Sequence, residues 1–284
     1  MAILETRDLS YSYDGENKAI DNINIKIPKG KITAIMGGNG AGKSTFFLNL
    51  NGVLTPDSGK VYFKGNEVAY NKKGIREMRK EVGIVFQDPN DQLFSSSVRK
   101  DISFGAINLG LSEQEVKKRV DDAIKRVGIE ELEYRPTHAL SYGQKKRVAI
   151  AGVLVMEPEV MILDEPTAGL DPAGVSEIMT LLLEINRSMG ISVVIATHDI
   201  DIIPLYCNHA FVFDKGRVII EGTPKEIFSK ADILRKHSLR IPRIAHLMEI
   251  LKDKDYINVD ESAATISAAR ASIKKVFSER RVEE

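Results

Sequence analysis

A glycine-rich segment near the start of the chain, residues 37–45, constrains its fold more than any other feature. The segment reads Gly-Gly-Asn-Gly-Ala-Gly-Lys-Ser-Thr and fits the pattern G-x-x-x-x-G-K-[ST]. An apolar run at Ile32–Met36, typical of a buried strand, precedes it, and a helical pattern at Lys43–Val53 follows it. A strand, a glycine-rich loop and a helix in this order predict an α/β unit whose loop cradles phosphate groups.

The chemistry of a bound nucleotide explains the residues of this phosphate loop. Glycines let the main chain curl until its N–H groups converge on phosphate oxygens, and the following helix adds the partial positive charge of its N-terminus. Lys43 brings a full charge to the β- and γ-phosphates, and Ser44 brings a hydroxyl ligand for Mg²⁺. The other expected nucleotide contacts come from the rest of the loop: Gly37, Gly38, Asn39, Gly40, Ala41, Gly42 and Thr45. The alternative is a strand-to-helix turn that binds nothing, but the correct flanks, the lysine and the hydroxyls coincide and favour binding.

Two adjacent carboxylates follow another apolar run, Val160–Leu163. A buried strand that ends at Asp164 would place this carboxylate at the edge of the sheet where open α/β folds bind ligands. Asp164 is therefore expected to hold Mg²⁺, directly or through water. Glu165 is expected to point at the attacking water as a general base or polarising group. The alternative is that the pair only caps the next helix.

The composition argues against several classes of protein. Lys and Arg total 40, as do Asp and Glu, so the formal net charge is zero, whereas a nucleic-acid binder usually carries a basic excess. Cys207 is the only cysteine, which leaves no internal disulfide or thiolate metal cluster and suits a reducing compartment. The start has no signal-peptide pattern, and the apolar stretches fall short of the roughly 20 residues of a membrane-spanning helix. We expect any membrane role to come through a partner.

The apolar pattern divides the chain into regions of different character. Alternating residues before the phosphate loop predict strands. Apolar runs at Val160–Leu163, Ser192–Ala196 and His209–Phe213 suit parallel strands covered on both faces. Helical patterns from Val98 to about Met156 predict a helical subdomain inserted into this α/β core. After about Ser229 the chain becomes helical and charged, as in a small appended region.

One short segment, Leu140–Gln144, decides which family of phosphate-binding proteins the sequence resembles. It reads Leu-Ser-Tyr-Gly-Gln and looks like the signature Leu-Ser-Gly-Gly-Gln of the ATP-binding cassette (ABC) family. Further elements of that family stand in the proper order: Tyr13 where an aromatic ring stacks on adenine, Gln87 like the glutamine loop, Ala168–Asp171 like the aspartate loop, and His198 like the switch histidine. The resemblance spans about residues 2–225. A P-loop kinase would leave the signature unexplained.

The resemblance implies an enzyme that hydrolyses ATP with Mg²⁺. It assigns catalytic roles to Lys43, Gln87, Glu165 and His198, and metal contacts to Ser44, Gln87 and Asp164. It also implies the fold class, which is an α/β P-loop NTPase core of the ABC type with an antiparallel β subdomain. The ATPase domain is expected at 2–236, with the helical subdomain at about 88–156 inside it, and a C-terminal helical extension at 237–284.

In the ABC family the signature of one subunit contacts the nucleotide held by the phosphate loop of another. Ser141, Gly143 and Gln144 are therefore expected to contact ATP across a head-to-tail dimer with the same or a homologous chain. Hydrolysis would loosen such a dimer because the γ-phosphate bridges it. Tyr142 replaces the first glycine of the family signature, which puts in doubt how closely the main chain approaches ATP at that position.

Two segments, Phe86–Phe94 and Ser141–Gly152, are similar to the ATPases of energy-coupling-factor importers, particularly the cobalt-type ones. This resemblance implies a peripheral subunit at the cytoplasmic face of the cell membrane, bound to transmembrane subunits and without contact to the solute. Cobalt or a related transition-metal ion is the expected cargo; a vitamin importer and an ABC exporter are the alternatives. We expect Asp88 and Asp91 to receive basic side chains of the membrane partner, unless they only form a solvated turn.

Two further interpretations stay open at this point. A soluble ABC protein of translation or DNA maintenance is disfavoured, because the chain has neither a second cassette with a charged linker nor long heptad insertions. The C-terminal region has two apolar stripes at helical spacing, which either pair two subunits or pack back on the core. The first comprises Ile241, Ile244, Leu247, Met248 and Leu251, and the second Ile266, Ala269, Ile273, Val276 and Phe277.

Overall fold

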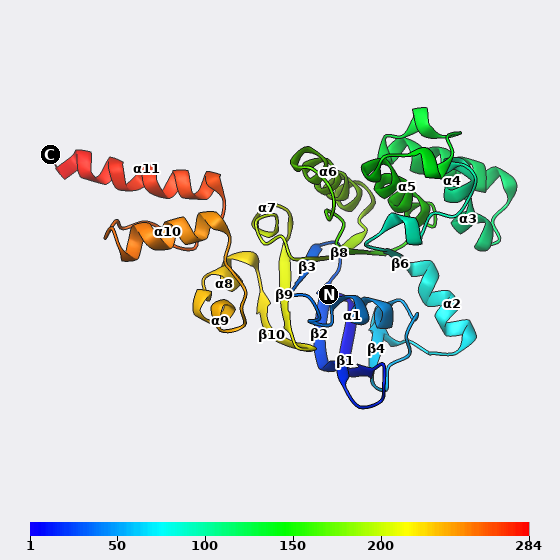
Figure 1. Cartoon of the computed structure of the whole chain (residues 1–284), viewed down its shortest axis with the longest axis horizontal. Helices are drawn as coiled ribbons and strands as arrows, with labels where there is room; N and C mark the ends of the chain where they lie inside the picture. The colour runs from blue at the N-terminus through cyan, green and yellow to red at the C-terminus, as the bar shows by residue number, and fades with distance from the viewer. Residues whose placement is uncertain (284) are drawn as a thin grey trace.

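The computed structural model describes residues 1–283, with side chains to residue 278, and its strands form two sheets (Figure 1). A four-stranded antiparallel sheet has the order β2-β1-β4-β5, and a six-stranded sheet the order β10-β9-β3-β8-β7-β6. The strands of the first sheet are β1 Ala2–Ser12, β2 Lys18–Pro28, β4 Ser58–Phe63 and β5 Asn66–Glu67. The strands of the second are β3 Ile32–Met36, β6 Val82–Val85, β7 Val160–Asp164, β8 Ser192–Thr197, β9 His209–Asp214 and β10 Arg217–Gly222. These are the α/β core and antiparallel β subdomain that the sequence predicts.

The register of the parallel strands positions the functional loops. Met36 pairs with Thr197 across β3 and β8, and Asp164 pairs with Ala196 across β7 and β8. The carboxyl ends of these three strands therefore lie at one edge of the sheet, and the segment after β6 joins them through the β6–β7 pairing. The phosphate loop, the two carboxylates, His198 and Gln87 consequently emerge side by side, as ligand sites in open α/β sheets do.

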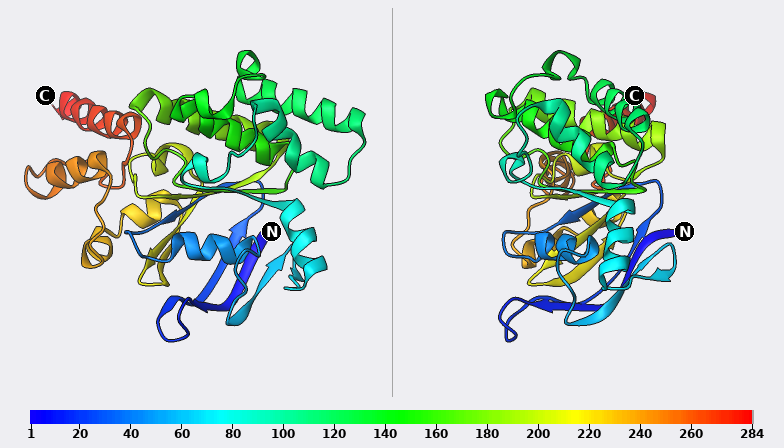
Figure 2. Two further views of the ribbon diagram at one scale, coloured as in Figure 1. Left: turned by 45° about the vertical axis from the view of Figure 1, so that its right-hand side comes forward. Right: turned by 90° about the vertical axis from the view of Figure 1, so that its right-hand side faces the viewer.

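The central strand β3 is buried at every position because each face of the sheet is covered by different elements. Ile32, Ala34 and Met36 face a core shared with the helices that follow β6 and β7, whereas Ile35 faces a core shared with α1 and the antiparallel sheet. Figures 1 and 2 show the antiparallel sheet and the helices α3–α5 on opposite sides of the six-stranded sheet.

The helices include the expected α-helical block between β6 and β7. That block contains α3 Val98–Asn108, α4 Glu113–Val127 and α5 Tyr142–Leu154, with 3₁₀ turns at Pro89–Asp91, Glu130–Leu132 and Thr137–Ala139. The remaining core helices are α1 Lys43–Leu50, α2 Lys72–Glu81, α6 Pro172–Met189 and α7 Ile203–Tyr206. Helix α1 ends at Leu50, three residues before the predicted end, because the chain turns at Gly52, whose φ is +71°. None of the helices in residues 1–283 combines the length and hydropathy needed to cross a membrane.

The C-terminal region comprises α8 Pro224–Phe228, α9 Ala231–Lys236, α10 Arg243–Asp253 and α11 Ile266–Glu283. Helices α10 and α11 lie side by side at the end of the molecule remote from α3–α5 (Figure 1, Figure 2). Met248 and Ala269 share a small apolar cluster of their own, and Asp201 ties this region to the core by accepting the N–H of Arg243 at 2.9 Å. The predicted extension ended at Glu284, which lies outside the described residues.

Candidate functional site

The phosphate loop is shaped by close main-chain approaches that only glycine permits. Gly42 has φ of +99°, and a Cβ atom there would lie 2.6 Å from the carbonyl oxygen of Ala19. A Cβ on Gly37 would lie 2.6 Å from the carbonyl oxygen of Phe213. A Cβ atom on Gly38 would have no neighbour within 4 Å, so the space next to this residue is open. The loop is thus clamped between β2 and β9 while part of its outer edge remains accessible.

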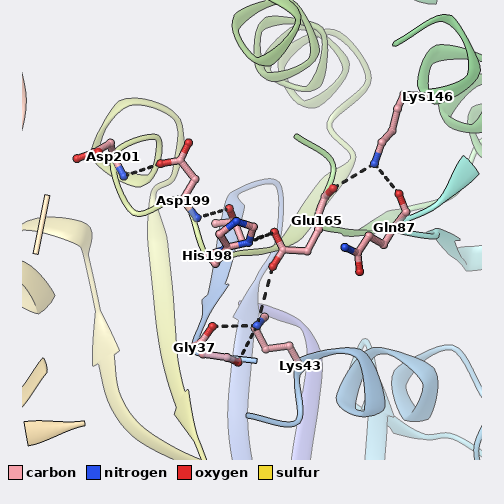
Figure 3. Close-up of polar contacts among 10 residues, drawn as sticks. Gly37, Lys43, Gln87, Lys146, Glu165, His198, Asp199 and Asp201 are labelled. Atoms are coloured by element: carbon pink, nitrogen blue, oxygen red, sulfur yellow. Dashed lines mark hydrogen bonds and ion pairs between the residues drawn. The ribbon is translucent and has the colours of Figure 1, made fainter. Parts of the chain in front are cut away.

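Lys43 begins α1 and turns its side chain back over the loop. Its Nζ donates to the carbonyl oxygens of Gly37 at 2.9 Å and Gly38 at 3.1 Å, and lies 3.9 Å from Oε1 of Glu165 (Figure 3). The side chain is buried, as is that of Glu165. An ammonium held over the loop mouth can exchange these carbonyl partners for phosphate oxygens, which are stronger acceptors because they are charged.

The two carboxylates leave the end of β7 in different ways. Asp164 closes the strand and lines the same cleft as the phosphate loop. Glu165 adopts φ of +47°, an uncommon conformation outside glycine, and its N–H donates to the carbonyl of Ala196 at 3.1 Å. Its Oε2 lies 2.8 Å from Nδ1 of His198, as Figure 3 shows. The turn aims Glu165 away from the strand and toward the histidine that follows β8.

One cleft of about 500 Å³ brings most of the predicted site residues together. Its lining comprises Tyr13, Ala19, Asn39, Gly40, Ala41, Gly42, Lys43, Ser44, Thr45, Gln87, Asp164, Glu165 and His198. Tyr13 is 64% exposed, and its hydroxyl lies 3.2 Å from Oγ1 of Thr45, so its ring is available for stacking beside the loop. Gly37 and Gly38 stand at the base of the loop and do not line this cleft.

The oxygen atoms in the cleft suit magnesium. Ser44, Gln87 and Asp164 supply a hydroxyl, an amide oxygen and a carboxylate, which are hard ligands that leave room for phosphate oxygens and water. No group of three or more His, Cys, Asp and Glu side chains among the described residues is arranged to hold a metal ion. The donor set therefore fits a Mg²⁺ ion that arrives with a nucleotide better than a permanently bound transition metal.

The signature residues lie elsewhere. Ser141 is the N-cap of α5, where its side chain and that of Gln144 form a capping box with distances of 3.3 and 2.9 Å. Ser141, Gly143 and Gln144 do not line the cleft that holds the phosphate loop of the same chain. The start of α5 instead offers an exposed helix N-terminus, a suitable place for phosphate groups of a second molecule.

Two residues make contacts at the site that were not predicted from the sequence. Lys146 is 1% exposed, and its Nζ donates to the carbonyls of Gln87 at 2.7 Å and Glu165 at 3.1 Å (Figure 3). Burial lowers the pKa of Lys146 to about 8, although Asp88 and the two carboxylates after β7 oppose the shift. The helical spacing of α5 could have indicated that Lys146 is buried, because it lies on the same face as the apolar Ala149, Ile150 and Val153.

Tyr142 is the second such residue, at the position where the signature departs from the family. Its hydroxyl donates to the carbonyl of Gln87 at 3.3 Å, and burial raises the pKa of this hydroxyl. Its ring packs on Gly169 of the aspartate loop, where a Cβ atom would lie 2.9 Å from the ring. The half-buried tyrosine therefore contacts its own chain, where it links the loop of Gln87 to that of Gly169.

Comparison with known proteins gives the family. The ABC transporter family matches residues 20–168, more than half of the chain. This chain belongs to the ABC transporter ATPases. It is 58% identical over 271 residues to the energy-coupling factor transporter ATP-binding protein EcfA2 of Clostridium perfringens, and the match covers 95% of each chain. This ABC ATPase is therefore of the energy-coupling-factor type, and it binds and hydrolyses ATP to energise transport.

Solved structures agree with the fold. cbiO1 of Clostridium perfringens, part of the ABC transporter complex cbiONQ, is 59% identical with a TM-score of 0.77, over 88% of this chain and 99% of that one. The ATP-binding cassette MJ0796, a dimer in a post-hydrolysis state with ADP and Pi, is 27% identical with a TM-score of 0.70, over 78% of this chain and 98% of that one. The predicted ABC fold and ATPase activity are thus confirmed.

Proposed function

We propose that this ABC ATPase works as a pair of identical chains at the cytoplasmic face of a membrane complex that imports cobalt or a related transition-metal ion. The observation that carries the catalytic part is the meeting of Lys43, Asp164, Glu165 and His198 at the carboxyl ends of neighbouring strands. These residues supply the charges and proton acceptors that phosphoryl transfer to water needs.

Each side chain then has a distinct task. Lys43 balances the charge of the β- and γ-phosphates, and Ser44, Gln87 and Asp164 would hold Mg²⁺, which would supply further positive charge beside the phosphates. Glu165 accepts the proton of the attacking water. His198, 2.8 Å from Glu165, orients that carboxylate and donates to the γ-phosphate.

The position of the signature supports the paired arrangement. Ser141, Gly143 and Gln144 lie outside the cleft of their own chain, so a single chain leaves one side of a bound γ-phosphate open. The N-terminus of α5 from a second copy supplies hydrogen-bond donors to that side. Two identical chains arranged head to tail then enclose two ATP molecules.

A groove beside the glutamine loop is the proposed seat of the transmembrane subunit. It has a volume of about 880 Å³ and lies between α2, α3 and α5. Phe94 on its wall is 65% exposed and contacts Phe104 edge-to-face at 4.8 Å, so the groove presents large apolar groups to solvent. Its α2 rim is basic, with Lys72, Arg76, Arg79 and Lys80. An amphipathic helix with apolar anchors fits this surface.

Asp88 and Asp91 are exposed next to this groove and are the proposed acceptors for basic side chains of the same partner. Asp88 also caps the 3₁₀ turn by accepting the N–H of Asn90 at 2.9 Å. Reversing both charges to lysine should abolish co-purification with the transmembrane subunit while ATP binding persists. The matched control reverses Glu130 and Glu131, which are exposed and do not line the groove. Intact assembly of the Asp88/Asp91 variant would reject this contact.

The cargo is proposed from the resemblance of Phe86–Phe94 and Ser141–Gly152 to cobalt-type ATPases. The test is ATP-dependent uptake by vesicles containing the complete complex that co-purifies with this chain. Labelled cobalt or nickel should accumulate inside, and the Glu165→Gln complex should not accumulate it. Uptake of a vitamin in place of metal, or net export, would overturn this assignment but leave the ATPase role intact.

A further inference from the structure

A buried lysine in the helical subdomain contacts the main chain of two loops at the candidate site. Lys146 donates one hydrogen bond to the carbonyl of Gln87 at 2.7 Å and one to the carbonyl of Glu165 at 3.1 Å. Burying an ammonium group is unfavourable unless its hydrogen bonds are recovered. The two carbonyl oxygens recover hydrogen bonds for this buried ammonium and fix its position between the two loops.

Glu165 is held by several contacts from different elements. Its N–H donates to Ala196 on β8, and its carbonyl accepts from Ala168 at 3.1 Å as well as from Lys146. Because its φ of +47° is sparsely populated outside glycine, the surrounding contacts must keep the residue in this conformation. Lys146 is the contact that comes from α5, the helix that carries the signature.

The other end of the Lys146 link is the glutamine loop. The carbonyl of Gln87 also accepts from the hydroxyl of Tyr142 at 3.3 Å, and Lys145 reaches Oδ1 of Asn90 at 2.7 Å. The first turns of α5 are therefore bound to the loop that borders the groove. Lys146 therefore connects this loop to the main chain of Glu165.

We propose that Lys146 is a positioning residue for ATP hydrolysis, which joins the carbonyl of Gln87 to that of Glu165. The orientation of the Glu165 carboxylate then depends on the loop beside the membrane-facing groove. This inference rests on the proposed role of Glu165. It differs from a purely structural role, in which the loss of Lys146 would weaken folding and ATP binding along with turnover.

The test compares the purified full-length wild-type chain with Lys146→Met, which keeps the length of the side chain and removes the donor. With ATP and Mg²⁺, kcat should fall about tenfold or more, since small displacements of a catalytic group are costly, while the Kd for ATP stays within about twofold. Lys145→Met is the matched control, because Lys145 contacts the same loop but not Glu165, and its kcat should stay within about twofold of wild type. Should Lys146→Met fail to fold, Lys146→Gln keeps a polar group at this buried position, but its shorter side chain cannot hydrogen-bond both carbonyls as the ammonium does, and it should show the same selective loss of kcat.

Coupling to Glu165 separates positioning from general damage. Adding Lys146→Met to Glu165→Gln should cause no further loss of turnover, because the group to be positioned is already gone. Four outcomes would each overturn the inference. Two concern Lys146→Met alone: an unchanged kcat, or a fall in kcat that is matched by an equal fall in ATP affinity. The others are an equal effect of Lys145→Met on kcat and additive losses of turnover in the double variant. If Glu165→Gln turned over ATP as fast as wild type, the proposed catalytic role of Glu165 would be overturned as well. If Glu165→Gln were inactive while Lys146→Met kept the wild-type kcat, only the positioning role of Lys146 would be overturned.

Discussion

The carboxylate of Glu165 lies between the side chain of His198, which follows β8, and that of Lys43, which begins α1. Its Oε2 is 2.8 Å from Nδ1 of His198, and its Oε1 is 3.9 Å from Nζ of Lys43. In the proposed mechanism both partners also serve the γ-phosphate. Nucleotide binding therefore changes the partners of this carboxylate, and the state of the phosphate is coupled to the orientation of the proposed base.

His198 should affect turnover more than nucleotide binding. Its replacement by alanine removes the imidazole beside Glu165 and is expected to lower kcat about tenfold to a hundredfold, with the Kd for ATP within about threefold. His246→Ala is the control, because His246 is exposed on α10 and contacts Glu249. Steady-state ATP hydrolysis and equilibrium ATP binding are the measurements. Equal turnover of the two variants would reject the role of His198.

The clamp on the phosphate loop predicts a difference in stability between alanine substitutions at two of its glycines, Gly42 and Gly38. Gly42→Ala adds a Cβ atom 2.6 Å from the carbonyl of Ala19 at φ of +99°, and should lower the free energy of unfolding by about 1–3 kcal/mol. Gly38→Ala meets no atom within 4 Å and should change it by less than about 0.5 kcal/mol. Urea denaturation compares them. Equal stabilities would contradict the clamped geometry.

Lys146 should make the free energy of unfolding depend on pH. Its pKa is lowered in the folded chain to about 8, against 10.5 for the exposed group. Between these values the unfolded chain binds more protons than the folded chain, so this group makes the free energy of unfolding increase with pH. Wild type should therefore gain stability relative to Lys146→Met from about pH 8 upward. Parallel pH profiles in denaturant titrations would contradict the burial of a charged amine.

The sequence predicted the parts of this fold whose patterns are local. Wholly buried strands such as Val160–Asp164 and Ser192–Thr197, and the loop between Met36 and Lys43, follow from composition and spacing. The order of the strands does not, because β3 lies between β8 and β9 only through contacts between residues far apart in the chain.

In the candidate site, too, the residues with local patterns could be predicted from the sequence, whereas the contacts between distant segments could not. Glycines, the lysine and the paired carboxylates are readable in order, but the positive φ of Glu165 depends on its contacts with Ala196 and Lys146. Tyr142 appeared in the sequence only as a departure from the family signature. Its contacts with Gln87 and Gly169 arise where α5, the glutamine loop and the aspartate loop meet, which sequence spacing cannot specify.

The central claim is that the phosphate loop of one chain is completed by the signature of a second copy. Mixing two inactive variants tests it most directly. Lys43→Ala disables the phosphate loop, and Ser141→Arg blocks the signature. In a mixed head-to-tail pair, one site keeps both an intact loop and an intact signature. ATP hydrolysis should therefore reappear when the two folded variants are combined, although each is inactive alone. A mixture that remains as inactive as its components would contradict the paired site.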